Sequence, residues 1–419
     1  MRTNITKLAI YLVAFLTILD SSMMWMLIQG TILTSNVVYV LQCIFIILAS
    51  FSFRNKNIRV SCVRYTLIGM VYMAMYLLFT RINVLGFMRS ILVPLLLCFV
   101  FCYQMVNNRK LSLFISAYGN ILLVIAVISL IGWGLGSMLN VLPGRMTISY
   151  EWADQVLPSY TYGFLYFENP VQSSGTLIRN TGIYAEAPGY SAYLLFAIGL
   201  ELFAYRRLRK GRFAVLCAAL ISTFSTKGQI ILIAIIILKF VLQVKARNNI
   251  ILCIKILASG LIVVMGMVLA IGILTEKSTT SSYIIRMDDL LSLFKAWLSS
   301  PLYGVGYGNI EAVQRFQMVT RSNDGLSMGL AVLLAYGGLW LLILYVGAFI
   351  CAITRPILKP YRRSIVLFST LVMMNLFISN QCFIPVTLLM VACGYATLAL
   401  PKRQSPLKQG LQQQTATTA

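Results

Sequence analysis

The 419-residue sequence contains no histidine and only 11 acidic residues, and charged residues of both signs make up 11% of it. Soluble domains carry roughly 25% charged residues. The absence of histidine excludes histidine as a general base or a metal ligand. Because 59% of the residues are hydrophobic, we expect most of the chain to lie in a lipid bilayer, which excludes a soluble enzyme.

The nine cysteines are scattered through apolar stretches with no paired CxxC spacing, so neither a zinc site nor a disulfide framework is indicated. The net charge of +23 could suggest a nucleic-acid partner. The lysines and arginines instead form short runs between apolar segments, as in residues 206–212. Such runs set the orientation of membrane proteins, so no nucleic-acid partner is expected.

Apolar segments of near-spanning length recur along the chain and predict an all-α membrane protein with about 12 transmembrane helices. Residues 1–400 form a single polytopic domain in this interpretation, and residues 401–419 form a polar, disordered cytoplasmic tail. The predicted spans are Leu8–Leu27, Val37–Phe51, Tyr65–Phe79, Ile91–Met105, Leu111–Trp133, Tyr190–Ala204, Phe213–Phe224, Gln229–Leu242, Ile250–Leu274, Leu326–Ile353, Ile365–Ile378 and Phe383–Leu400.

The distribution of charge predicts the orientation. Placing the basic runs inside puts both termini in the cytoplasm and leaves two long outer loops, 134–188 and 275–325, after spans five and nine. Most acidic residues then fall in outer loops, and the exceptions are Asp20 and Glu201. We expect a protein of the cytoplasmic membrane whose functional face is outside.

The two outer loops carry distinct signals. The first is rich in aromatic residues between positions 152 and 167, which indicates an ordered surface whose rings either stack on sugars or form a membrane-interface belt. In the second, apolar residues recur at helical spacing over Ser282–Leu298, which predicts a helix on the outer surface. A glycine-spaced turn follows at Gly304–Asn309, and it resembles a nucleotide-binding fingerprint only superficially.

Basic residues on the outer side stand against the usual charge bias. They either pair with outer carboxylates and lipid headgroups or bind an anionic ligand, and guanidinium groups match phosphate in a bidentate manner. These outer residues are Arg81, Arg89, Arg145, Arg179, Lys227, Lys277, Arg286, Lys295, Arg315 and Arg321.

Several motifs in the outer loops resemble those of one family. Arg179–Tyr190 resembles the Arg-x-x-Gly-x-x-x-Glu element that precedes a span in bacterial O-antigen and capsule repeat-unit polymerases (Wzy type). Ser225–Gly228 resembles the family's Ser-Arg-Gly turn, with Lys227 in place of arginine. Arg286 with Pro301–Asn309, and then Ser322–Gly325 with Leu334–Leu339, resemble its second-loop pattern. The resemblance covers about residues 179–339, and the first half matches only in hydropathy.

The resemblance implies a metal-independent glycosyltransferase without a cofactor. Such an enzyme transfers a growing glycan from polyprenyl diphosphate onto a lipid-linked repeat unit, and it works with a chain-length regulator and a flippase. Arg179 and Arg286 would stabilise the departing diphosphate. Because histidine is absent, Glu186 or Asp324 would accept the proton of the acceptor hydroxyl, although either could be only a helix cap or the partner of an arginine. The residues expected to bind diphosphate or glycan are Arg89, Lys227, Arg315, Arg321 and Tyr184.

Two alternatives stay open from the sequence. The related O-antigen ligases share the layout but typically carry a histidine in the second long loop, so the absence of histidine favours a polymerase. A secondary transporter or flippase of lipid-linked oligosaccharide would also have about 12 spans without a cofactor. It would be expected to show internal repeats and charges at the middle of the membrane, and the sequence shows no clear repeat.

Overall fold

The computed structural model describes residues 2–19, 22–28, 34–53, 60–80, 83–142, 145–152, 155–171, 173–174, 177–205, 207–243, 281–319, 326, 328–355 and 362–399. This part of the chain is mostly helical. Five of its helical segments are long and apolar enough to cross a membrane by length and composition, and they indicate a membrane protein. These segments are Ser35–Ser52, Val60–Thr80, Val84–Asn107, Leu111–Met138 and Gly329–Thr354. The count of 12 spans and the orientation stay predictions, and predicted span nine lies outside the described residues.

The elements follow one another along the chain as a helical bundle interrupted by a group of short strands. The first half contains α1 (Arg2–Ile18), α2 (Met24–Leu27), α3 (Ser35–Ser52), α4 (Val60–Thr80), α5 (Val84–Phe87), the π-helix η1 (Met88–Leu92), α6 (Val93–Asn107), α7 (Leu111–Ile131), the π-helix η2 (Gly132–Met138), β1 (Met146–Trp152), β2 (Gln155–Thr161), β3 (Phe167–Glu168), β4 (Ser173–Ser174) and β5 (Leu177–Ile178). The second half contains α8 (Ala187–Phe203), α9 (Lys210–Ser222), α10 (Thr226–Gln243), α12 (Ser281–Ser299), α13 (Ile310–Gln314), α14 (Gly329–Thr354), α15 (Arg362–Ile378), α16 (Pro385–Ala396) and the 3₁₀ turn η4 (Thr397–Ala399).

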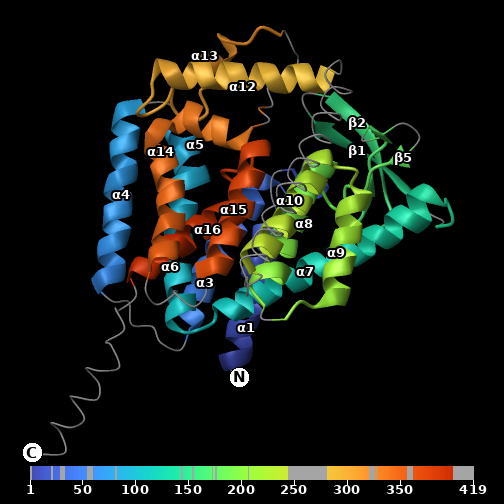
Figure 1. Cartoon of the computed structure of the whole chain (residues 1–419), viewed down its shortest axis with the longest axis horizontal. Helices are drawn as coiled ribbons and strands as arrows, with labels where there is room; N and C mark the ends of the chain where they lie inside the picture. Colours follow the sequence, from blue (N-terminus) through green and yellow to red (C-terminus); the bar gives the residue numbers. More distant parts are fainter. Residues whose placement is uncertain are drawn as a thin grey trace, which may run out of the picture.

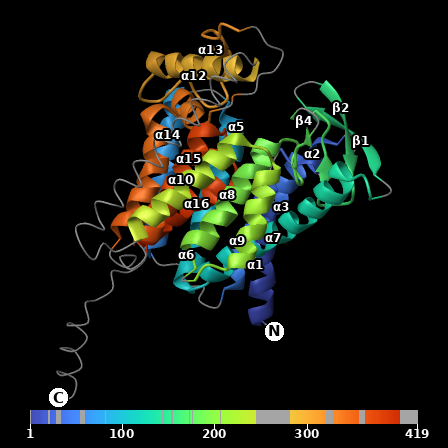
Figure 2. The same ribbon diagram turned by 45° about the vertical axis from the view of Figure 1, so that its right-hand side comes forward.

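The bundle has two distinct ends. Helix α12 lies across one end, roughly perpendicular to upright helices such as α4 and α14, and the strands lie at that same end (Figure 1, Figure 2). The first residues of α1 lie at the opposite end. There Thr6 donates a hydrogen bond to the carbonyl of Ser52 (2.9 Å), and Ser61 donates to the carbonyl of Ala399 (2.9 Å). The two predicted outer loops therefore share one end of the molecule.

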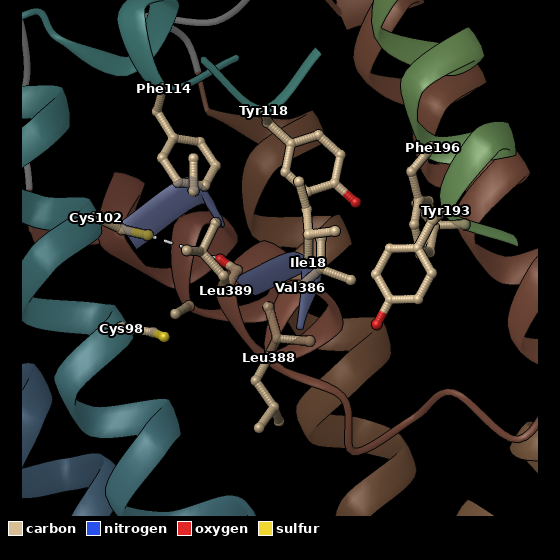
Figure 3. Packing of buried hydrophobic residues seen from close by; sticks show 14 of the residues in the cluster. Ile18, Cys98, Cys102, Phe114, Tyr118, Tyr193, Phe196, Val386, Leu388 and Leu389 are labelled. Atoms are coloured by element: carbon tan, nitrogen blue, oxygen red, sulfur yellow. Dashed lines mark hydrogen bonds between the residues drawn. The ribbon is translucent and has the colours of Figure 1, made fainter. Parts of the chain in front are cut away.

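Apolar side chains of α1, α6, α7, α8 and α16 interlock at the centre of the bundle (Figure 3). Ile18, Tyr193 and Val386 are almost completely buried there, although they are far apart in the sequence. The thiol of Cys102 in α6 contacts the carbonyl oxygen of Leu389 in α16 at 3.7 Å. This close packing holds the ends of the helices in fixed relative positions.

The first predicted span, Leu8–Leu27, is wrong as a single helix. Helix α1 ends at Ile18, and the side-chain amide of Gln42 donates to the carbonyls of Leu16 (2.7 Å) and Leu19 (3.2 Å), which satisfies its last turn. The chain then runs beside the first predicted outer loop through the bridges Met23–Tyr184 and Ile28–Tyr150. Asp20 lies outside the described residues.

The expectation of a purely helical chain needs one correction. The loop 134–188 contains an antiparallel sheet in the order β1–β2–β3 and a second pair, β4–β5. Both long strands carry β-branched and aromatic residues in partial alternation, which is typical of half-buried strands. The loop is also shorter than predicted, because the helix of predicted span five continues through η2 to Met138.

Candidate functional site

Four of the predicted site residues converge at the end of the bundle that carries α12. Arg179 follows β5, Glu186 immediately precedes α8, Lys227 lies in the first turn of α10, and Arg286 lies in α12. Glu186 interacts electrostatically with the other three, and Lys227 interacts with both arginines. These four residues form the charged cluster, which contains three cations and one carboxylate.

The turn between Arg179 and Glu186 depends on its own residues. The side-chain oxygen of Asn180 accepts a hydrogen bond from the backbone N–H of Gly182 (3.0 Å), and Gly182 has a φ of 57°. A Cβ atom at this position would lie 2.8 Å from the ring of Tyr190. Glycine is therefore required both by the left-handed backbone and by the close approach to α8. The spacing Arg-x-x-Gly thus has a local structural cause.

Arg179 is fixed against the C-terminal end of α9. Its Nε atom donates to the carbonyl oxygen of Thr223 (2.9 Å), and the backbone N–H of Asn180 donates to the carbonyl of Ser222 (3.0 Å). Burial lowers the pKa of Arg179, Glu186 opposes this change, and Arg286 adds to it. A guanidinium still carries its charge at neutral pH. The cation is therefore permanent and held by the backbone of a neighbouring helix.

Glu186 is the N-cap residue of α8, but its side chain does not cap the helix. Within the described ranges, no cation lies within 4.0 Å of its carboxylate, so neither the cap nor the close ion-pair interpretation fits. Burial raises the pKa of Glu186, whereas Lys227, Arg286 and Arg179 lower it. A carboxylate with a raised pKa is a better proton acceptor than a free one near neutral pH.

Lys227 lies in the turn that precedes the apolar run Gln229–Leu242. Its ammonium donates a hydrogen bond to the hydroxyl of Ser379, which follows α15. The next residue, Gly228, allows α10 to approach α8, because a Cβ there would lie 3.0 Å from that of Ser191. The pKa of Lys227 is lowered to about 7. Burial is the largest cause, the charges of Arg286 and Arg179 also lower the pKa, and the charge of Glu186 raises it.

Arg286 is exposed on α12 and is brought to the charged cluster by the position of that helix. Leu293, which lies two turns further along the same side of α12, and Ala296 are completely buried and pack this helix onto the bundle. The carboxylate of Asp288 accepts a hydrogen bond from the backbone N–H of Met318 (2.9 Å). The helix predicted over Ser282–Leu298 is confirmed, and Arg286 near its beginning interacts with Glu186, which lies 100 positions earlier in the sequence.

The glycine-spaced turn positions α12 against a break in α14. Gly338, inside α14, has a φ of 56°, and a Cβ there would lie 2.5 Å from the carbonyl of Leu302. A Cβ at Gly304 would lie 2.5 Å from the carbonyl oxygen of Ala335. Backbone hydrogen bonds from Val305 to Ala335 (2.8 Å) and from Leu339 to Pro301 (2.9 Å) join the turn to the broken helix. These glycines are required by contact between two backbones.

The other predicted residues are placed elsewhere. Arg89 was expected in a short outer loop but lies in the π-helical turn η1 within the segment Val84–Asn107, away from the charged cluster. Tyr184 is completely buried, and its hydroxyl donates to the carbonyl of Ile18 (2.8 Å), so this side chain packs the core. Arg315 is exposed directly after α13. Arg321 and Asp324 lie outside the described residues.

Two charged residues outside the cluster have nearby partners. Arg145 pairs with Glu168 (3.1 Å) and lies over the ring of Tyr160. Glu201, one of the two carboxylates outside the predicted outer loops, pairs with Arg212 (2.9 Å) and also accepts a hydrogen bond from Arg209 (2.8 Å). Both arginines belong to the basic run 206–212, so this carboxylate neutralises part of the run.

Sequence reasoning missed the polar residues that hold the cluster. Ser379 binds Lys227, the Thr223 carbonyl binds Arg179, and Asn180 shapes the turn between Arg179 and Gly182. The side chain of Asn180 also donates to Ser222 (2.9 Å). Only the short Ser-Thr and Ser-Asn pairs at the ends of apolar segments could have signalled these positions. Their partners come from distant parts of the chain, which spacing does not reveal.

The arrangement is suited to an anion with several oxygen atoms. Two guanidinium groups and one ammonium can bind a diphosphate, and the carboxylate beside them can accept a proton from a hydroxyl. In the part of the chain that the structure describes, no three His, Cys, Asp or Glu side chains gather as metal ligands would. A scan against protein-family models and a search of curated proteins find no match to this chain.

Proposed function

We propose that the protein is a polysaccharide polymerase of the cytoplasmic membrane. It transfers a growing glycan from polyprenyl diphosphate onto a lipid-linked oligosaccharide repeat unit, and the charged cluster is its active site. The observation that carries the proposal is the convergence of Arg179 and Glu186 from one loop with Lys227 of α10 and Arg286 of α12. The same residues belong to the motifs that resemble the repeat-unit polymerases.

The chemistry requires one bond to form and one to break. The acceptor hydroxyl attacks the anomeric carbon of the donor glycan, and the bond from that carbon to the diphosphate oxygen breaks. The proton of the hydroxyl moves to the carboxylate of Glu186. The electron pair of the broken bond leaves with the diphosphate, whose developing charge Arg179, Arg286 and Lys227 stabilise. The donor is already activated by its diphosphate, so no nucleotide is consumed.

The direct test is chain elongation in membranes supplied with a lipid-linked repeat unit. Arg179→Ala and Arg286→Ala are each expected to reduce elongation by roughly 100-fold or more, the effect of removing one fixed donor to a developing anion. Arg64→Gln is the matched control, because Arg64 is exposed in α4 and lies over Tyr65 outside the cluster. Elongation at the wild-type level in both alanine variants, with normal expression, would contradict the proposal.

The proposal also requires the cluster to face outside. A cysteine that replaces the exposed Arg315 in an active cysteine-free protein should react with a membrane-impermeant maleimide in intact cells. A cysteine that replaces the exposed Lys7 of α1, at the other end of the bundle, should react only after the cells are opened. The reverse pattern would place the cluster in the cytoplasm and exclude the proposed reaction. Transport of the lipid-linked oligosaccharide without new glycosidic bonds would favour a flippase.

A further inference from the structure

Arg89 lies in an unusual backbone segment. The turn Met88–Leu92 is π-helical and connects α5 with α6, and Pro94 follows it at the second position of α6. Proline has no N–H to donate to the preceding turn, so it favours a local change from the regular α-helical pattern. Short π-helical turns inside helices are frequent at functional sites. The unusual backbone therefore indicates a functional role for Arg89 independently of its charge.

The neighbours of Arg89 orient its guanidinium without neutralising it. Its Nη2 atom donates to the hydroxyl of Ser35 (3.2 Å), and its Cζ atom lies 5.5 Å from the ring centroid of Tyr39. Among the residues that the structure describes, no carboxylate lies within 4.0 Å of this guanidinium. A half-buried cation with neutral partners favours an anion as its ligand.

A cavity of about 160 Å³ lies against Arg89. Gln42 and Ser90 line it together with the arginine, and Leu19, Phe383 and Ile384 contribute an apolar wall. One cation beside an apolar surface suits a phosphate headgroup that continues into a hydrocarbon chain. Another cavity, of about 250 Å³ between α4, α6, α14 and α16, has no charged side chain among the described residues that line it and offers no such combination.

The cavity and the charged cluster are separate but connected by one short segment. They share no residue, yet Ser379 binds Lys227 and Ile384 lines the cavity. Five residues of fully extended chain span at most about 18 Å. The serine that binds Lys227 and the wall of the Arg89 cavity are therefore joined by a segment that fixes an upper limit of about 18 Å on the separation of Ser379 and Ile384.

We infer that the Arg89 cavity binds the diphosphate headgroup of a second lipid-linked molecule, the acceptor, while the charged cluster binds the donor. This inference rests on the proposed function, because joining two glycans that are both anchored to lipid requires both to be held at once. Arg89 then positions the acceptor and takes no part in the bond changes. Its loss raises the KM for the acceptor and leaves kcat nearly unchanged.

Binding tests the inference without requiring turnover. Native mass spectrometry of the detergent-purified protein with polyprenyl diphosphate as probe is expected to show two bound molecules in the wild type. Arg89→Gln and Arg179→Gln should each weaken one of the two by roughly tenfold or more, and the double variant should weaken both. Arg89→Lys keeps the charge and should retain most of the second binding, and Arg64→Gln should bind like the wild type.

Several outcomes would overturn the inference. Unchanged binding of two molecules by folded Arg89→Gln protein would do so, as would displacement of the second molecule by equal amounts of phosphatidylglycerol or by inorganic pyrophosphate. Asp20→Asn is made in parallel, because Asp20 follows the lining residue Leu19 in the sequence. If Asp20→Asn restored stability to the Arg89→Gln protein while two lipid molecules still bound, Arg89 would be the ion-pair partner of Asp20 and not a ligand for the second headgroup.

The readouts also separate this inference from the proposed function. If two molecules bind as expected but the wild type elongates no glycan, the polymerase assignment fails and the second lipid site stands. If the wild type elongates glycans and Arg89→Gln changes neither the number bound nor the KM for the acceptor, the second site fails and the polymerase assignment stands.

Discussion

The Nε atom of Arg179 donates a hydrogen bond to the carbonyl oxygen of Thr223 at 2.9 Å, which joins the end of the first long loop to the end of α9. A cation at the C-terminal end of a helix is favoured by the helix dipole. The contact fixes one edge of a guanidinium whose charge no close carboxylate within the described ranges cancels. Arg179 is thus positioned before any ligand arrives, which is what stabilising a departing anion requires.

Two arginines at the same end of the protein should respond differently to substitution. Arg145 pairs with Glu168, and its side chain is 44% exposed. Its buried partner Glu168 keeps hydrogen bonds from Ser137 (2.8 Å) and Tyr162 (3.3 Å) and lies outside the cluster, so Arg145→Gln should leave elongation within about twofold of the wild type. Arg179→Gln should reduce elongation by roughly 100-fold. Equal losses in both variants, measured at equal expression, would mean that general positive charge matters and the cluster does not.

Glu186→Gln tests the proton acceptor. Elongation should fall by roughly 100-fold or more, because an amide cannot accept the proton. Burial raises the pKa of Glu186, so wild-type elongation should decline with falling pH while a free glutamate would still be ionised. The residual activity of the variant should not follow that decline. If wild-type elongation does not decline as the pH falls, Glu186 is not the proton acceptor.

Stability provides a second readout for the same substitution. A raised pKa means that folding favours the neutral carboxyl, and this favourable contribution is lost as pH rises through the folded-state pKa. At neutral pH the ionised group therefore lowers the stability of the folded protein, and Glu186→Gln should unfold at the same or a higher temperature. A large decrease in the unfolding temperature would indicate that Glu186 supports the fold.

Lys227→Met should stabilise the protein while it impairs elongation. Burial lowers the pKa of Lys227 to about 7, so folding disfavours the charged form. The folded protein should gain stability as pH rises from about 7 towards the ordinary pKa of lysine, because only the unfolded chain keeps the proton there. The gain in unfolding temperature from Lys227→Met should be largest below pH 7 and shrink above it. Lys7→Met, at an exposed position of α1, is the matched control for the loss of a lysine.

Gly338→Ala should disturb the charged cluster from a distance. The substitution places a Cβ within 2.5 Å of Leu302 and forces alanine into a left-handed backbone, which costs roughly 1–3 kcal/mol. The turn that positions α12 should shift, so Arg286 should leave the cluster and elongation should fall. Gly134→Ala is the control, because a Cβ there meets no atom within 4 Å. Equal unfolding temperatures and equal elongation in both variants would contradict this role of the break.

The sequence predicted the parts of the fold that follow from local patterns. Long apolar segments predicted most of the helices. Apolar residues at helical spacing predicted the helix over Ser282–Leu298, which is confirmed as α12. The sequence also named all four members of the cluster, because charges at outer positions and the motif spacing are visible in one dimension. It failed at the break after Ile18, where the apolar run resumes after three polar residues at 20–22 but Met23 pairs with Tyr184 instead of continuing the helix.

The partners of the cluster residues were missed for a physical reason. Thr223 and Ser379 lie far away in the sequence from Arg179 and Lys227, which they bind. Composition alone assigned the aromatic residues of the first loop to a sugar-binding or membrane-interface surface. Tyr166 and Phe167 are instead almost completely buried. Pairing between remote segments decides such cases, and a single sequence does not display it.

The interruption of the first helix has a practical consequence for anyone who engineers this protein. Met24 donates to the carbonyl of Ile183 (2.8 Å), and Ala185 donates to the carbonyl of Ser22 (2.9 Å). The amino-terminal segment thus pairs with the residues just before Glu186 through backbone hydrogen bonds and holds them in place. Truncations or fusions that replace the first 30 residues would remove these hydrogen bonds, even though they touch none of the ionisable groups assigned to the reaction.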